Sequence, residues 1–473
     1  GEGQFTGGLD GNQQDLTLNF TATVTIDGSE TFGNIANLSV QNAANLSGTI
    51  NTTGFQNYGG SVTLIGDTTL QGTSGAFLDG MDGQANNLQL KFSSETEIDG
   101  STVFSNIGDL NSTGPVRLRG AISTTGFQNY GTTATLFGDT TLNSGGAGNV
   151  SFGGTVDGAS RLDIEAGSGR VEFFGALGST TPLRNLNLTS ASAVTALGTV
   201  AIDGTGAGSD GLLIGTSVSN VNIAQPGSTI TNANLAGIRF AGGSQNSTVG
   251  GFTITGSGGA GVELNPGIYN NTFIENNILT AGGAHGVYAN GTIGSLTIAG
   301  NRIGGNARSG VRMQNAINFK GAVAVVANNT IGLDAAGNAA QPNAGQGIIF
   351  LGGSQGSAIN NTIGGSGYYG IVVQDGASGI SLTENRIGVA ADFSTPVPNG
   401  QSGIFVLGGA TGTVIAKNTI RGNSGMAGIQ VVDGSTNTMI GGVTAGDANL
   451  IVGNGEFGIT VSGDVSGSQI LPN

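Results

Sequence analysis

Residues 360–373 read NNTIGGSGYYGIVV, and this stretch contains both halves of the repeat that decides the fold. The Gly-Ile/Val-x-apolar half begins at residues 237, 261, 286, 310, 347, 370, 403, 428 and 458, mostly at intervals of 23–25. The Asn-x-Ile half lies between these copies. A period near 24, built from short β-branched segments separated by Gly, Asn or Asp, is typical of a parallel β-helix. The sequence predicts an all-β protein: a right-handed parallel β-helix, or solenoid, of about 20 rungs.

Alternation within each strand predicts which side chains face the core. In GIVV, Ile371 and Val373 point inward and Val372 points outward. The same register predicts an aliphatic core made of Ile348, Phe350, Ile371, Val373, Ile404, Val406, Ile429 and Val431.

Two polar features recur beside these strands. Five residues after the Gly of each copy, most rungs carry a residue that tolerates positive φ, as Asn315 and Asp375 do. The Asn of the second half recurs at 276, 301, 329, 361, 385 and 418, and stacked Asn side chains can form hydrogen-bonded ladders. We expect these Asn residues to stabilise turns rather than to bind a ligand.

The first half carries a longer repeat. TTGFQNYG occurs at 52–59 and again at 124–131, an offset of 72 residues. The simplest interpretation is three rungs of about 24 residues each. We therefore predict a β-helix shaft with 72-residue, three-rung repeats over 1–200. Over 201–473 the β-helix should continue, with inserted loops at 332–347, 388–403 and 441–458.

Composition excludes several classes of protein. The net charge of −15 argues against nucleic-acid binding, and the absence of Cys excludes disulfides and thiolate metal sites. No apolar run approaches the roughly 20 residues of a membrane helix, so we expect no membrane insertion. Because the chain begins with Gly1 rather than Met, we expect a processed chain or a fragment.

The two halves resemble different groups of known proteins. The first half, with GDTTL at 66–70 and 138–142 and GRVEFFGALGSTTPLRNLNL at 169–188, resembles the shafts of filamentous-haemagglutinin-type exoproteins and autotransporter adhesins of bacteria. The second half is similar to the general parallel β-helix repeat. This resemblance implies a bacterial protein at the cell surface or outside the cell, and its second half is compatible with carbohydrate-active enzymes as well.

Candidate chemistry is sparse. His285, in GAHGVYANG, is the only His of the chain, and AHG is similar to the Gly-His-Gly of polygalacturonase-like hydrolases. The acidic motifs of that group are missing, so we predict His285 to be a turn residue and predict no catalytic, cofactor-binding or metal-binding residue. Calcium, held by single Asp residues in turns, stays an alternative.

One candidate contact surface emerges from the outward positions of the second half. Ile349, Val372 and Phe405 are three apolar residues in a row, and they occur between the inserted loops, whose acidic centres are Asp334 and Asp392. We expect the loops to bury this strip, with a partner surface as the alternative.

The resulting functional prediction is a non-enzymatic, extracellular structural or adhesive β-helical segment of a larger bacterial surface or secreted protein. Its expected partners are further copies, assembled end to end, or other surface proteins or glycans. The alternative is a polysaccharide-active enzyme or a carbohydrate-binding module of the parallel β-helix type.

Overall fold

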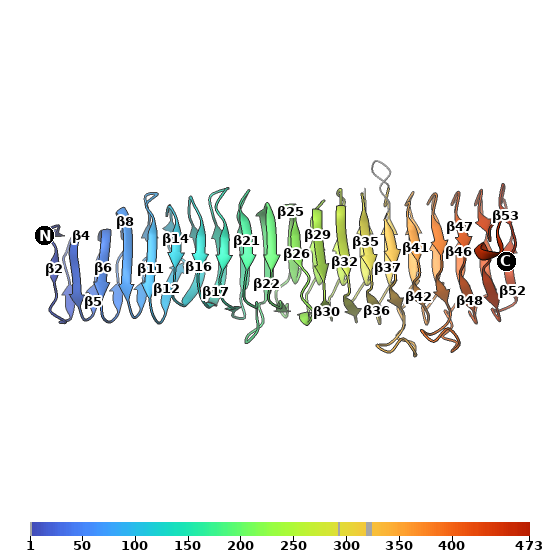
Figure 1. The fold of residues 1–473 in the computed structure, drawn as a ribbon, viewed down its shortest axis with the longest axis horizontal. Helices are drawn as coiled ribbons and strands as arrows, with labels where there is room; N and C mark the ends of the chain where they lie inside the picture. Colours follow the sequence, from blue (N-terminus) through green and yellow to red (C-terminus); the bar gives the residue numbers. More distant parts are fainter. Residues whose placement is uncertain (1, 292–293, 318–323) are drawn as a thin grey trace. The chain divides into compact units, whose positions relative to one another are not determined.

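The computed structural model describes residues 2–291, 294–317 and 324–473. The chain forms two compact units: unit 1 contains 1–203 and 217–225, and unit 2 contains 204–216 and 226–473. In both units nearly every strand pairs in parallel with a strand of the coil before it and of the coil after it (Figure 1). The predicted parallel β-helix is therefore confirmed, with about 18 turns rather than about 20. The one helical segment in the described part of the chain is the short 3-10 helix η1 (Ala445–Asp447).

The strands of unit 1 are β1 (Gly3–Phe5), β2 (Leu9–Asp10), β3 (Leu16–Leu18), β4 (Val24–Ile35), β5 (Leu38–Val40), β6 (Ala44–Thr52), β7 (Gln56–Tyr58), β8 (Val62–Gly72), β9 (Gly75–Phe77), β10 (Met81–Asp82), β11 (Leu88–Phe92), β12 (Thr96–Gly100), β13 (Phe104–Ser105), β14 (Leu110–Ser112), β15 (Val116–Ser123), β16 (Gln128–Tyr130), β17 (Ala134–Asn143), β18 (Val150–Phe152), β19 (Val156–Asp157), β20 (Arg161–Glu165), β21 (Arg170–Phe173), β22 (Asn185–Ala191), β23 (Ala193–Ala196), β24 (Ala201–Asp203) and β26 (Val221–Ile223).

The coils of unit 1 are shorter than the sequence repeat predicts, and they differ in length. Ala44 pairs with Val62 of the next coil, whereas Met81 pairs with Phe104, which is a longer step along the chain. The offset between the two copies of TTGFQNYG therefore covers more than three coils. Strand β7 of the first copy pairs with β5 and β9, whereas β16 of the second copy pairs with β14 and β18. The two copies thus lie in different sheets, and the three-rung interpretation of the repeat is wrong.

Except at the two ends, each coil of unit 2 contributes one strand to each of three sheets. Sheet I contains β25 (Leu212–Val218), whose last residues belong to unit 1, and β28 (Ile238–Phe240), β31 (Val262–Leu264), β34 (Val287–Asn290), β37 (Val311–Gln314), β40 (Ile348–Leu351), β43 (Ile371–Val373), β46 (Ile404–Val406), β49 (Ala427–Val431) and β52 (Phe457–Val461). Sheet II contains β29 (Gln245–Gly250), β32 (Asn270–Glu275), β35 (Leu296–Ala299), β38 (Val325–Ala327), β41 (Ser357–Ile359), β44 (Ser381–Thr383), β47 (Val414–Ala416), β50 (Met439–Ile440) and β53 (Gln469–Ile470). Sheet III contains β27 (Ser228–Thr231), β30 (Phe252–Thr255), β33 (Ile278–Thr280), β36 (Arg302–Gly304), β39 (Thr330–Ile331), β42 (Thr362–Ile363), β45 (Arg386–Ile387), β48 (Thr419–Arg421) and β51 (Leu450–Val452).

The predicted core of unit 2 is confirmed. All eight side chains assigned to the interior of sheet I are fully buried. Ile371 pairs directly with Ile348 and Ile404 on the neighbouring coils, so equivalent residues stack into an aliphatic column. The turn that follows each strand has the expected conformation at Asn315 (φ 52) and Asp375 (φ 53).

A ladder of buried Asn side chains runs through unit 2, as the sequence predicts. It begins at Asn277, one residue later than expected, and continues through Asn301, Asn329, Asn361, Asn385, Asn418 and Asn449. From Asn277 to Asn418, each Nδ2 donates to the Oδ1 of the next Asn at 2.9–3.0 Å, and Asn449 Nδ2 donates to Asn473 Oδ1 at 2.8 Å. These contacts lie inside the coil, which supports a structural role for the ladder.

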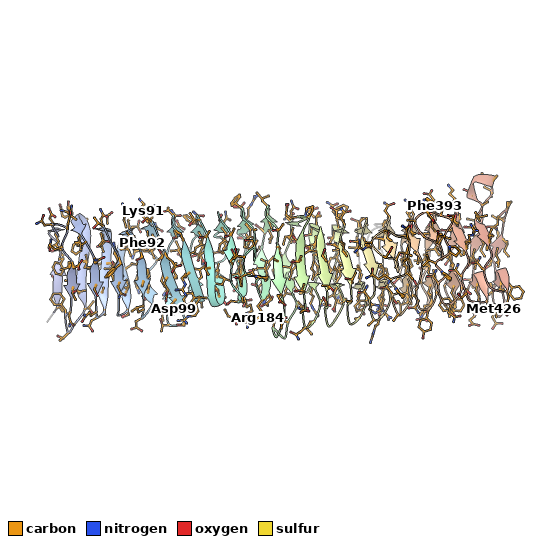
Figure 2. The ribbon with its side chains drawn as sticks, turned by 90° about the horizontal axis from the view of Figure 1, so that it is seen from below. Lys91, Phe92, Asp99, Arg184, Phe393 and Met426 are labelled. Carbon is orange, nitrogen blue, oxygen red and sulfur yellow. The ribbon has the colours of Figure 1, made fainter. Side chains whose placement is uncertain are left out.

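The first two inserted loops project from the same edge of unit 2, beside β42 and β48 (Figure 1). They contact each other: Leu333, Ala390 and Val397 form a small buried cluster, and the N–H of Ala391 donates to the carbonyl of Gly337 at 2.8 Å. Phe393 (Figure 2) lies in the second loop, with its ring centre 4.1 Å from the guanidinium carbon of Arg386. The third insertion, 441–458, differs because it contains η1 and β51.

Candidate functional site

A pocket of about 260 Å³ lies on the outer surface of sheet I, where the chain enters β31, β34 and β37. We call it the His285 pocket. Its polar lining residues are Glu263, His285, Tyr288, Arg308 and Arg312. Tyr288 and Arg312 occupy the central, outward position of their strands and pair with each other. His285 and Arg308 lie just before the strands, so the regular register of the coils brings all four side chains together.

His285 is almost completely buried, with 5% of its surface exposed. Its Nδ1 accepts the backbone N–H of Ser309 at 3.2 Å, so the neutral ring carries its proton on Nε2. Burial, followed by the positive charges of Arg312 and Arg308, lowers the pKa of His285 to about 4. At neutral pH the site therefore holds an uncharged imidazole close to two arginines of the next coil, with Nε2 as the nitrogen left for a ligand.

Tyr288 connects the imidazole to the arginine of the next strand. The His285 and Tyr288 rings have centroids 5.5 Å apart, and the Arg312 guanidinium carbon lies 5.8 Å from the Tyr288 ring centre. The Tyr288 hydroxyl donates to Gln314 Oε1 at 3.2 Å, and Arg312 donates to the same oxygen through Nε and Nη2. Gln314 thus fixes the positions of both side chains.

The arginines near the pocket differ in their partners. Arg239 pairs with Asp210 at 2.9 Å and with Glu263 at 3.4 Å, so its charge is balanced. Neither Arg308 nor Arg312 forms an ion pair within the described ranges of the chain. Two arginines without acidic partners, beside a neutral imidazole, suit the binding of an anion.

The candidate contact strip lies on the next strands of the same sheet. Ile349 pairs with Arg312 on one side and with Val372 on the other, and Val372 pairs with Phe405. Ile349 and Val372 are buried with Leu351, while Tyr369 and Leu407 pack against them. The Tyr369 ring stacks on Phe405 at 4.5 Å. The strip is therefore covered largely by its own aromatic and aliphatic neighbours, and its role toward a partner stays a prediction.

Asp334 and Asp392 are turn residues of their loops. Asp334 Oδ1 accepts the N–H groups of Asn338 and Ala339, which lower the pKa of Asp334. Asp392 accepts the hydroxyl and N–H of Thr395 and the N–H of Ser394, and these bonds lower its pKa to about 2. Both carboxylates are engaged in holding the loop backbone.

The sequence interpretation missed the His285 pocket. His285 was assigned to a turn, but it is a buried side chain that faces two arginines. The available signal was the outward series Arg239, Glu263, Tyr288 and Arg312, read together with the two residues before each repeat glycine, which include His285 and Arg308. Among the described residues, no group of three or more His, Cys, Asp or Glu side chains is placed to hold a metal ion.

Comparisons with known proteins agree with the fold. Residues 210–387 and 315–445 match the family model described as a right-handed β-helix region, and these ranges include the His285 pocket. No curated protein sequence matches the chain. Within the described residues, no helix has the length and apolar character needed to cross a membrane.

Two solved structures illustrate the likeness. The periplasmic alginate epimerase AlgG is 12% identical, with a TM-score of 0.31, over 82% of this chain and 77% of the epimerase. The A-module of the mannuronan C-5 epimerase AlgE4 of Azotobacter vinelandii is 15% identical, with a TM-score of 0.29, over 95% of this chain and 91% of the module.

These comparisons correct one prediction and leave another open. The two solved structures are of epimerases, one named for alginate and one for mannuronan, and the prediction that the chain is not an enzyme is withdrawn. The resemblance of the first half to adhesin shafts, and the cell-surface location that it implies, stay predictions.

Proposed function

Because the chain is a parallel β-helix repeat protein with an arginine-lined pocket on one sheet, we propose that it is an enzyme acting on an acidic polysaccharide. The observation that carries the proposal is the uncharged His285 beside Tyr288, flanked by two arginines without acidic partners. A sugar carboxylate matches this arrangement in charge. The net charge of −15 repels an anionic polymer from most of the chain. A local positive site is therefore the place where such a polymer would bind.

The reaction class follows from what the pocket offers. Arg308 and Arg312 would bind the carboxylate of a uronate and neutralise it, which lowers the cost of removing the proton from the adjacent carbon. The Nε2–H of His285 would donate to a carboxylate oxygen, as a neutral donor at the atom where charge develops. Tyr288 would accept this proton as a phenolate, after its own hydroxyl proton has passed to solvent. In the structure its hydroxyl donates to Gln314 Oε1 at 3.2 Å, which fixes the position of the oxygen.

Two outcomes share this first step. The electron pair of the broken C–H bond enters the carboxylate as an enediolate. Return of a proton from the opposite face inverts the carbon, which is epimerisation. Expulsion of the oxygen on the neighbouring carbon, which takes up a proton as it leaves, breaks the chain by β-elimination. Such a polymer is met outside the cytoplasm, so we also propose a periplasmic or secreted location.

Incubation with polymannuronate and polygalacturonate in heavy water tests the proposal. We expect deuterium at the carbon beside the carboxylate, detected by proton NMR whether the product is an epimer or an unsaturated sugar. Tyr288→Phe, which keeps the ring but removes the hydroxyl, should reduce the exchange rate by about 100-fold or more. Arg312→Ala should reduce it as well, while Arg421→Ala, which removes an exposed arginine, should not.

Two results would overturn the assignment. One is the absence of exchange on any polyuronate by the native chain. The other is exchange that survives both Tyr288→Phe and Arg312→Ala, which would place the chemistry elsewhere.

A further inference from the structure

The phrase TTGFQNYG builds the same buried network at both of its positions in unit 1. The amide Nε2 of Gln56 donates to the carbonyls of Ile50 and Gln71, and its Oε1 accepts the Tyr58 hydroxyl at 2.9 Å. The second copy repeats this arrangement, with Gln128 bonded to Ile122, Asn143 and Tyr130. This network explains the Thr, Gln and Tyr of the phrase, but it does not use its Phe.

The Phe of each copy points outward instead. Phe55 is 42% exposed and Phe127 is 40% exposed. The N–H of Phe55 donates to Asn37 Oδ1 at 3.0 Å, and the N–H of Phe127 donates to Asp109 Oδ1 at 2.9 Å. The preceding glycine makes this possible, because a Cβ on Gly54 would clash with that Asn37 oxygen. Each copy thus holds an aromatic ring at the surface through the same type of hydrogen bond from the Phe backbone N–H.

Both rings line pockets. The pocket at Phe55, of about 410 Å³, is also lined by Asn57, Ser74, Ala76, Glu95 and Glu97. The small side chains of Ser74 and Ala76 leave room for the pocket, and Glu95 and Glu97 come from the coil that follows them. The Asn57 Oδ1 atom is buried and has no hydrogen-bond partner within the described part of the chain. A rotation of this amide toward the pocket would let the oxygen accept a hydroxyl of the ligand.

The pocket at Phe127, of about 420 Å³, has the same chemical character. Its other lining residues include Asp67, Thr69, Asn87, Gln89 and Asn111. Hydroxyl, amide and carboxylate groups therefore line a wall beside an exposed ring in both pockets. Neither lining contains Lys or Arg, and both contain carboxylates.

We propose that these two pockets bind uncharged sugar rings of a glycan, one ring at Phe55 and one at Phe127. The apolar face of a sugar ring would stack on the Phe, and its hydroxyls would bond to the amides and carboxylates, since a few polar groups around an apolar surface fix a ligand's orientation. A uronate is disfavoured most strongly at Phe127, where its carboxylate would meet Asp67 and Asp109. At Phe55 the two carboxylates of Glu95 and Glu97 share one cationic partner, Arg117, so the pair keeps a net negative charge. The pockets thus differ in selectivity from the His285 pocket and do not depend on the function proposed for it.

Isothermal titration calorimetry of the whole chain tests this inference. The probes are hexasaccharides of β-1,4-glucan, β-1,4-mannan and β-1,4-xylan, with hexamers of mannuronate and galacturonate in parallel. We expect at least one neutral hexasaccharide to bind with a stoichiometry of two. Phe55→Ala and Phe127→Ala should each reduce the stoichiometry to one, and the double variant should show no binding at the same concentrations.

Phe174→Ala provides the matched control, because Phe174 is 52% exposed in unit 1 and lines neither pocket. It should bind as the native chain does, and all variants should melt at the native temperature. Failure of every neutral hexasaccharide to bind would overturn the proposal, as would native binding by the double variant or displacement of the neutral ligand by a uronate hexamer. Proton exchange on polyuronates is a separate measurement, so either proposal can fail alone.

Discussion

At the scale of single residues, His285 is a buried imidazole beside two arginines, and the regular register of the coils brings these side chains together. One coil supplies His285 and Tyr288, the next supplies Arg308 and Arg312, and successive coils lie about 4.8 Å apart. Arg308 and Arg312 therefore come from the coil after His285, close enough to lower its pKa. The backbone N–H of Ser309 then selects the tautomer.

The protonation state of His285 is directly measurable, because it is the only His of the chain. We expect the nitrogen NMR signals of uniformly labelled protein to show a neutral ring with its proton on Nε2 from neutral pH down to about pH 5, and a midpoint near 4. Arg312→Ala should raise the midpoint, since a positive neighbour that disfavours imidazolium is removed. A native midpoint near 6.5, or a proton on Nδ1, would contradict this description of the site.

The lowered pKa of His285 also makes the free energy of unfolding depend on pH. The unfolded chain binds a proton at His285 below about pH 6.5, whereas the folded chain does not until about pH 4. Between these values the unfolded state holds more protons. The contribution of His285 therefore lowers the free energy of unfolding as the pH falls from about 6.5 to about 4.

At the scale of elements, the Asn ladder replaces a continuous apolar core at one corner of unit 2. Each member satisfies backbone groups of neighbouring coils as well as the next Asn. Asn361 Nδ2 donates to the carbonyl of Val326 at 2.8 Å, and its Oδ1 accepts both the N–H and the Nδ2 of Asn329. The stability of such a ladder is sensitive to substitution, because removal of one member leaves several buried groups without partners.

Asn361→Ala should therefore be strongly destabilising. We expect each orphaned group to cost about 1–3 kcal/mol, for a total of several kcal/mol, visible as a lower denaturation midpoint. Asn338→Ala is the matched control, because its side chain is exposed in loop 332–347, and it should change stability by less than about 0.5 kcal/mol. Equal midpoints for the two variants would show that the ladder contributes no net stability.

At the scale of the whole molecule, parallel pairing is nearly always with the adjacent coil. Stability in such a chain is approximately a sum over coils and their interfaces. Damage to one coil should therefore remain local, spreading over the few coils that pack against it and not over the entire chain.

Ile371→Asp tests this locality. The side chain is fully buried and pairs with Ile348 and Ile404, so an unpaired carboxylate there should cost several kcal/mol. Hydrogen exchange should accelerate in β40, β43 and β46, while the amides of unit 1 keep their native rates. Gln401→Asp, which places the same charge on an exposed side chain, should leave exchange unchanged. Uniform acceleration throughout the chain would argue for all-or-none unfolding instead.

Some features followed from the sequence alone because they depend on periodicity. Alternation along the strand predicts a register that buries Ile371 and Val373. The same pattern recurs in the other coils and predicts the same register there. The turns at Asn315 and Asp375 followed from residue types that tolerate positive φ. The Asn ladder followed from spacing, with an error of one residue at its start, where the chain places Asn276 in the turn and Asn277 in the ladder.

Other features were decided only by the tertiary structure, because they depend on coil length and on side chains that do not repeat. Coils of unequal length place the two copies of TTGFQNYG in different sheets, although the copies are identical in sequence. The His285 pocket joins residues from three successive coils, and although they occupy equivalent positions, their side-chain types do not repeat. Sequence therefore determined which side chains face the core, where solvent exclusion imposes a rule on every coil. Structure decided which outward side chains meet, since the surface of a solenoid imposes no such rule and only the stacking of the coils sets their neighbours.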